Sequence, residues 1–150
     1  MAQKMPFAFE TVFSHWKKLP DGSYESKADV IRQLRYAGYF VVLLFVGLAI
    51  PELSILRVQM RQSQGGHGVP EDRLRARFPR TQLAIRYAAP LAHRTLMFDN
   101  SRSLKDAFTL VRAQKGHKVI YDCRLDPAAK VLSLVANVWL QHVAPLPKYQ

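Results

Sequence analysis

Hydrophobic and polar positions along the chain follow two spacings, one typical of buried strands and one typical of helices. From Tyr39 to Val46 every position is apolar and many are β-branched or aromatic, which favours a strand covered on both faces of a parallel sheet. Thr95 to Asp99 is a second apolar strand, and it runs into the turn residues Asn100 and Ser101. A shorter strand-like run, Phe7 to Phe9, lies near the start of the chain.

Helix signals separate these strands. The run from Ser26 to Asp29 has the spacing of a capping box, and the helix that it opens ends at Gly38. Pro51 sits at the first position of a second helix. A loop is expected over 17–26. A third helix begins at about 69–72; Pro79 interrupts or kinks it, and it continues over 81–93. A hairpin of 108–111 with 118–121 and a closing helix from Asp126 follow.

This order predicts an α/β fold, namely a partial parallel sheet flanked by helices, followed by a small C-terminal hairpin and the closing helix. At 150 residues and 49% hydrophobic composition, the chain fits a single domain, 1–150, with a real core, which excludes a disordered polybasic tail. The longest apolar run, Tyr39 to Pro51, is 13 residues, short of the roughly 20 of a membrane span. No secretory signal opens the chain, and the single cysteine, Cys123, allows no internal disulfide, so we expect a cytoplasmic setting without membrane partners.

Charge narrows the class of partner only loosely. The chain carries 22 Lys and Arg against 11 Asp and Glu, a net charge of +11, and the stretch from Arg57 to Arg94 holds eight arginines and only two acids. Arginine binds phosphate oxygens with two parallel hydrogen bonds. Small phosphorylated ligands, nucleic acid and membrane surfaces all attract a basic domain by the same electrostatics, so the charge alone does not distinguish them. Arg73, Arg77 and Arg80 lie on one face of the third helix, and a solvated face is their simplest interpretation.

Three groups of residues carry candidate chemistry. Glu10, Thr11 and Ser14 follow the run Phe7 to Phe9, and ligands bind at the carboxyl ends of strands in open α/β sheets. The pair Arg57 and Arg61 lies four residues apart along one edge of the second helix, and a glycine-rich loop with His67 follows that helix. The alternatives are a surface carboxylate with turn hydroxyls, arginines that only extend along apolar surface, and a loop that merely turns the chain. No metal site of His and Cys is expected, because their spacing fits none.

Taken in order, several strings resemble one family, the zeta-toxin family of P-loop kinases, and more narrowly its chromosomal bacterial branch. These strings are FAFETVFS, GYFVVLLFVGL at Gly38 to Leu48, PELSILRV, the R-x-x-x-GGH-x-VPED run from Arg61 to Asp72, FPR, and FDNS at Phe98 to Ser101. The similarity covers about residues 5–102. Its specific part is GGH-x-VPE at the correct spacing from FETVFS and FDNS.

The resemblance implies an ATP-dependent kinase that uses Mg²⁺ and acts on a sugar nucleotide such as UDP-N-acetylglucosamine, with an antitoxin as a further partner. By the same resemblance, the residues take these roles: Glu10, Thr11 and Ser14 on the substrate side, Arg61 as the catalytic arginine at the γ-phosphate, Arg57 and His67 as helpers at the nucleotide, and Asn100 and Ser101 toward the adenine.

The sequence departs from this family at its start. It contains no G-x-x-x-x-G-K-[ST] motif, and the family's early catalytic acid is also missing. The chain therefore resembles the carboxyl-terminal two-thirds of such a kinase, inactive alone unless a complementing N-terminal segment supplies the phosphate loop. The alternative is a non-catalytic basic module that binds nucleotide, nucleic acid or an acidic protein. The missing strand would lie beside Tyr39 to Val46, so we expect either direct pairing with Phe7 to Glu10 or an exposed apolar edge that leads to self-association.

Overall fold

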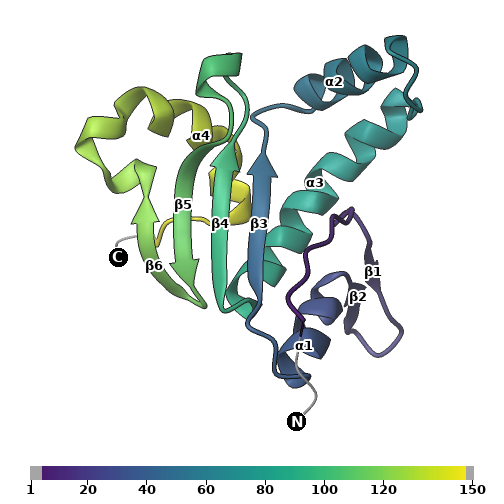
Figure 1. Cartoon of the computed structure of the whole chain (residues 1–150), viewed down its shortest axis with the longest axis vertical. Helices are drawn as coiled ribbons and strands as arrows, with labels where there is room; N and C mark the ends of the chain where they lie inside the picture. The colour runs from purple at the N-terminus through teal and green to yellow at the C-terminus, as the bar shows by residue number, and fades with distance from the viewer. Residues whose placement is uncertain (1–4, 148–150) are drawn as a thin grey trace.

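A four-stranded mixed sheet forms the centre of the computed structural model, which describes residues 5–147 (Figure 1). Its strands are β3 (Val42–Gly47), β4 (Arg94–Asp99), β5 (Thr109–Lys115) and β6 (Lys118–Asp122), in that spatial order. β3 and β4 are parallel, whereas β4, β5 and β6 pair antiparallel. The α/β prediction and the C-terminal hairpin are confirmed, but only one of the strand pairs is parallel.

Within residues 5–147, four α-helices and a small separate hairpin complete the fold. They are α1 (Ala28–Tyr36), α2 (Pro51–Ser63), α3 (Glu71–Ala88) and α4 (Lys130–Val143), with β1 (Trp16–Lys18) and β2 (Tyr24–Ser26) forming the hairpin. Within residues 5–147, no helix is long and apolar enough to cross a membrane.

The expected start and end of α1 are confirmed. The amide of Ala28 donates to Ser26 Oγ at 3.1 Å, and the amide of Ser26 donates to Asp29 Oδ2 at 3.2 Å, so both capping hydrogen bonds are present. Gly38 ends the helix with a φ of +77°, a conformation that glycine adopts without strain. The short helix is therefore fixed at both ends by its own sequence.

Three local predictions are wrong. Residues 7–10 form no strand, because their backbone joins no ladder. The expected loop over 17–26 contains the β1–β2 hairpin, in which the rings of Trp16 and Tyr24 stack at 4.8 Å. α3 runs through Pro79, so the expected interruption is wrong, whereas a kink at Pro79 stays a prediction. Pro79 is exposed and packing against α2 and α4 holds the helix on either side of it, so the missing hydrogen bond does not end the helix.

Helices cover only one face of the sheet. In Figure 1, α3 descends beside β3 and its lower end passes behind the strands, and part of α4 also lies behind them. The buried core joins Met97 and Val111 of the sheet to Ile85, Trp139 and Leu140 of these helices. The opposite face is open, and β3 ends the sheet with nothing paired to its outer side among residues 5–147. The prediction that this strand is interior and covered on both faces is therefore wrong. A run that is apolar at every position does not reveal whether a second layer exists to cover it.

Candidate functional site

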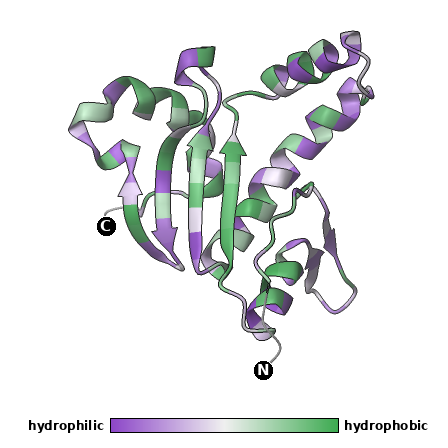
Figure 2. Ribbon diagram, viewed as in Figure 1, coloured by the Kyte–Doolittle hydropathy of each residue, from purple (hydrophilic) through white to green (hydrophobic). Residues whose placement is uncertain are grey.

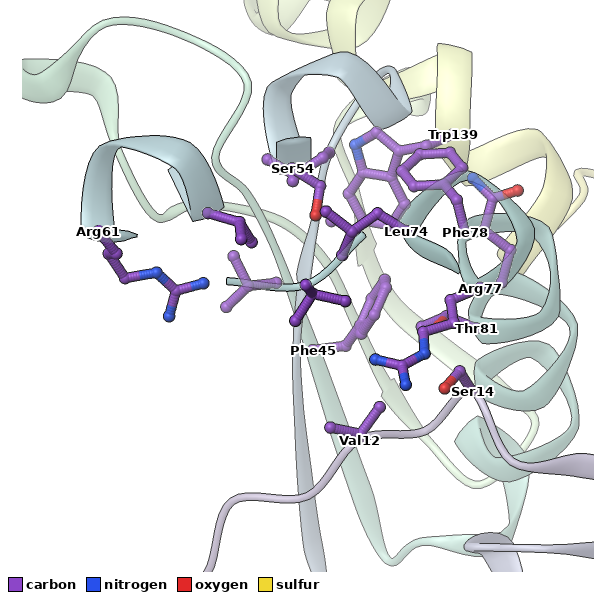
Figure 3. A pocket seen from close by; sticks show the side chains of 16 residues that line it. Val12, Ser14, Phe45, Ser54, Arg61, Leu74, Arg77, Phe78, Thr81 and Trp139 are labelled. Carbon is purple, nitrogen blue, oxygen red and sulfur yellow. The ribbon is translucent and has the colours of Figure 1, made fainter. Parts of the chain in front are cut away.

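A pocket of about 330 Å³ lies at the carboxyl end of β3, between α2, α3 and the segment that precedes β1 (Figure 3). Strand ends, helix termini and connecting loops meet there. The lining residues are Val12 and Ser14; Phe45, Val46, Gly47 and Leu48; Ser54, Val58 and Arg61; Val69; Leu74, Arg77, Phe78, Thr81 and Gln82; and Trp139.

The inner wall of the pocket is aromatic. The rings of Phe45 and Trp139 meet edge to face with their centres 5.6 Å apart, and Phe78 joins them from α3. Gly47 makes this arrangement possible, because a Cβ atom there would lie 2.4 Å from ring carbons of Trp139. The wall presents flat apolar surface suited to a ring of a ligand.

Two arginines flank the opening. Arg61 extends from α2 and Arg77 from α3, and Figure 3 shows their guanidinium groups on opposite sides of Phe45. Neither group makes a hydrogen bond or ion pair with any residue from 5 to 147, in contrast to Arg75, which pairs with Glu52. No acidic side chain lines the pocket. The arrangement therefore offers two uncompensated cations to an anionic ligand.

Neutral polar groups surround these arginines. Ser14, Ser54 and Thr81 present hydroxyls, Gln82 presents an amide, and all four side chains lack a hydrogen-bond partner within residues 5–147. Each hydroxyl can donate one hydrogen bond and accept others. The pocket therefore combines an aromatic wall, two cations and several free hydrogen-bonding groups.

Of the residues expected at a site, the structure brings only Ser14 and Arg61 into this pocket. Glu10 and Thr11 lie together on a shallow surface beside Val12 and Lys27. His67 is exposed in the glycine-rich loop and makes no hydrogen bond within residues 5–147.

Arg57, Asn100 and Ser101 hold the surrounding loops. The Arg57 guanidinium donates to the carbonyl oxygen of Asn100. The hydroxyl of Ser101 donates to Asp99 Oδ1 at 2.8 Å and accepts from the amide of Ala49 at 2.8 Å. These bonds join the loop after β3 to the loop after β4. The three residues thus fix the loops at the carboxyl edge of the sheet and do not line the pocket themselves.

Asp99 connects these loop contacts to the pocket wall. It is fully buried, and Trp139 Nε1 donates to its Oδ1 at 2.9 Å. The carboxylate therefore orients the indole that forms the inner wall.

Sequence reasoning missed Arg77, Thr81 and Ser54. Arg77 was grouped with Arg73 and Arg80 on a solvated face, and those two are indeed exposed. A signal was present, because Leu74 and Phe78 flank Arg77 at helical spacing and place it at the border of an apolar face.

The described residues do not fit Mg²⁺ and ATP. The pocket lining contains no carboxylate, and within residues 5–147 no group of three His, Cys, Asp or Glu side chains is placed to hold a metal ion. The amides and lysine of a phosphate loop are also lacking, since the motif does not occur in the 150 residues.

The strings that resemble the zeta-toxin family have different places in the fold. FAFETVFS contributes Ser14 to the pocket and the run from Arg61 contributes Arg61 itself, whereas FDNS supports the wall through Asp99. Comparison of the chain with protein-family models, characterised proteins and solved structures gave no match.

Proposed function

We propose that the chain is the substrate-binding part of a zeta-toxin-like phosphotransferase and that its pocket holds a sugar nucleotide or a similar phosphorylated compound with a free hydroxyl. The observation that carries this proposal is the pair Arg61 and Arg77, which face one pocket from two helices and whose guanidinium groups have no partner among residues 5–147. The sequence resemblance supplies the reaction class.

The chemistry of the pocket supports a phosphorylated ligand. Guanidinium groups bind phosphate oxygens in a fixed two-pronged geometry, and two of them on separate helices can contact neighbouring phosphates. The free hydroxyls of Ser14, Ser54 and Thr81 suit the hydroxyls of a sugar. The aromatic wall of Phe45 and Trp139 suits a ring, and the volume lies in the range of pockets for small molecules.

In phosphoryl transfer, negative charge spreads over the oxygens of the moving group, and arginines stabilise that charge. Arg61 is the residue that we propose for this role. Because the sequence contains no phosphate-loop motif, we propose that the chain binds substrate alone and transfers nothing until another segment supplies that loop. We therefore expect very weak binding of Mg·ATP to the isolated chain.

Calorimetric titration with UDP-N-acetylglucosamine tests the proposal. Arg61→Ala and Arg77→Ala should each weaken binding about 10-fold or more, because a hydrogen bond to a charged group contributes roughly 1.5–3 kcal/mol. Arg80→Ala is the matched control, since this arginine lies on the same helix as Arg77 but outside the pocket. Uridine, which lacks phosphates, should bind weakly and respond to neither variant.

A short RNA in the same titrations separates this function from a general basic module. Such a module would bind RNA through exposed arginines, and Arg80→Ala would weaken binding as much as Arg61→Ala. That result, or no binding of the sugar nucleotide at millimolar concentration, would contradict the proposal.

A further inference from the structure

Arg77 differs from the other arginines that lack a partner. Within residues 5–147, the arginine side chains that make no hydrogen bond, ion pair or ring contact are Arg61, Arg73, Arg77, Arg80 and Arg86. The other four residues are exposed to water, whereas Arg77 is partly buried and its guanidinium lies in the pocket (Figure 3). A cation that is partly withdrawn from water without a counter-charge costs free energy in the folded protein. The unpaired charge of Arg77 therefore points to an anionic ligand.

The surroundings of Arg77 offer no counter-charge. Glu71 and Asp72 at the start of α3 lie outside the lining of the pocket, which contains no acidic side chain. Leu74 and Phe78, the neighbours of Arg77 in the lining, are apolar. Figure 2 shows β3, whose carboxyl end borders the pocket, as hydrophobic along almost all of its length. Within residues 5–147, the guanidinium is therefore left for a ligand to neutralise.

Two hydroxyl groups lie on the same side of the pocket as Arg77. Thr81 follows Arg77 by one turn of α3, and side chains four residues apart on a helix are neighbours. Figure 3 shows Ser14 and Thr81 on the same side of Phe45 as the Arg77 guanidinium, with Arg61 on the other side. The polar groups of the pocket are therefore unevenly divided between its two arginines.

Both hydroxyls are free, and both are held in place by the fold. A threonine within a helix commonly donates to the carbonyl oxygen one turn earlier, but Thr81 makes no such bond to Arg77 or to any other residue from 5 to 147. Ser14 follows Phe13, which packs against both buried clusters of the core and so fixes this segment beside α3. Each hydroxyl can therefore donate to a ligand without giving up another hydrogen bond.

We propose that Arg77, Thr81 and Ser14 form a subsite for one phosphate group and that Arg77, rather than Arg61, anchors this phosphate. Two phosphate oxygens accept the parallel N–H groups of the guanidinium, and the remaining oxygens accept from the two hydroxyls. Arg61, exposed on the other side of Phe45, stays free for another group of the ligand. That the phosphate belongs to a sugar nucleotide rests on the proposed function, whereas the subsite itself requires a phosphate alone.

Inorganic phosphate is the probe that tests the subsite by itself. The full chain, labelled with ¹⁵N, is titrated with phosphate against chloride at constant ionic strength, and NMR follows the Arg77 Nε–H and the amides of Ser14 and Thr81. These signals should shift in a saturable way, with a Kd of roughly 1–20 mM for so small a ligand. Shifts that do not saturate, or that are the same in chloride, would overturn the proposal.

Variants identify the anchor. Arg77→Met keeps the apolar stem but removes the charge, and it should weaken phosphate binding about 10-fold or more, whereas Thr81→Val should weaken it about 2- to 10-fold. Arg80→Met is the matched control, since it removes the same charge from the same helix outside the pocket, and it should leave the Kd unchanged. Arg61→Met should weaken binding less than Arg77→Met does. An equal loss in Arg80→Met or in Arg61→Met would refute Arg77 as the anchor.

Stability separates a binding role from a structural one. Without phosphate, Arg77→Met should unfold at the same urea concentration as the wild type or a higher one, because it removes an uncompensated charge. Phosphate should raise the unfolding midpoint of the wild type but not that of Arg77→Met, because a ligand stabilises the state that binds it. A clear loss of stability in Arg77→Met without phosphate, with the wild type insensitive to phosphate, would assign Arg77 to the fold instead.

The same measurements distinguish failure of the subsite from failure of the proposed function. If phosphate binds in a manner that depends on Arg77 but UDP-N-acetylglucosamine does not bind, the subsite stands and the sugar nucleotide is the wrong ligand. If UDP-N-acetylglucosamine binds but phosphate gives no saturable shift at Ser14 and Thr81, the subsite is wrong and a sugar-nucleotide pocket remains.

Discussion

At the scale of single residues, the pocket wall depends on close contact between a glycine and an indole. Gly47 lies at the end of β3, directly against the ring of Trp139, whose N–H is held by buried Asp99. No other amino acid leaves room for this ring. The wall of the pocket and the packing of α4 on the sheet therefore rest on the same three residues.

We predict that Gly47→Ala destabilises the protein. The added Cβ would lie 2.4 Å from Trp139 ring carbons, and overpacking of this kind costs about 1–3 kcal/mol of unfolding free energy. Urea unfolding measures the change. Gly68→Ala is the control: its Cβ meets only the flexible end of Gln62, so it should be nearly neutral. Equal stability of the two variants would show that Trp139 can move away.

The thiol of Cys123 provides a second residue-scale prediction. It is fully buried, and burial raises its pKa from 9.0 to about 11. The unfolded chain loses this proton at a lower pH than the folded chain. The contribution of the protonated thiol to the free energy of unfolding is therefore complete below about pH 9 and declines toward pH 11. Urea unfolding at pH 8 and pH 10.5 should show this decline, and Cys123→Ala should reduce it. A thiol reagent that modifies the native chain rapidly at pH 8 would contradict the assigned burial.

At the scale of elements, a buried ionic cluster fixes the end of β6. Asp122 accepts hydrogen bonds from Arg112 on β5 and from Arg124, with Arg124 Nη2 2.7 Å from its Oδ2. Arg124 also donates to the carbonyl oxygen of Ala144, just after α4. The cluster therefore ties the C-terminal hairpin to the end of the closing helix.

We predict that Asp122→Asn costs about 3–5 kcal/mol of unfolding free energy, because it leaves two buried guanidinium groups without a counter-charge. Asp106→Asn is the control. Its ion pair with Arg102 spans 3.7 Å and is partly exposed, so its loss should cost less than about 1 kcal/mol. Denaturant unfolding at pH 7 compares the two variants, and similar losses would contradict the cluster's role.

The carboxylate of Asp122 also makes the free energy of unfolding depend on pH in the acid range. Burial opposes its ionisation, but hydrogen bonds from Arg124 and Arg112 outweigh burial and lower the pKa of Asp122 below its usual value of 3.8. Its contribution to stability is therefore present above about pH 4 and is lost as pH falls through the lowered pKa. Asp122→Asn should consequently lose less stability than the wild type between pH 5 and pH 2 in urea unfolding. An equal acid loss in both proteins would assign the effect to other groups.

Elements with strong local signals were predicted correctly. The capping box at Ser26, Pro51 at the start of α2 and the strand into Asp99 each fix a boundary by short-range chemistry. The errors arose where tertiary context decides. Pro79 stays helical because its neighbours pack, whereas Phe7 to Glu10 forms no strand although the outer edge of β3 is unpaired.

The candidate site shows the same contrast between features that local sequence predicts and features that tertiary contacts decide. Ser14 and Arg61 were predicted from motifs and lie in the pocket. Arg57 has similar spacing on the same helix, yet its guanidinium binds the Asn100 carbonyl oxygen, a contact 43 residues away that no local pattern reveals. Arg77 was missed because its role depends on how α3 crosses α2. Spacing along a helix therefore identifies a face, but not what that face meets.

At the scale of the whole molecule, stability is unevenly distributed across the sheet. β4 pairs on both sides and buries Thr95, Met97 and Asp99 completely, with α3 and α4 packed over it. β3 has one partner strand among the described residues, and residues 5–15 join no ladder. The fold is therefore most secure at the centre of the sheet and least secure beside the pocket and the free edge.

Amide hydrogen exchange on a dilute, monomeric sample should reveal this gradient. We expect the slowest exchange in β4, because opening it requires loss of the core. In β3, alternate amides should exchange much faster than their neighbours, since successive residues of a parallel strand direct their N–H groups to opposite sides and only one side is paired. Residues 5–12 should exchange fastest. Slow exchange at every position of Val42–Gly47 in the monomer would show that residues 5–12 have paired with β3, and the free edge assigned to this strand would then be wrong.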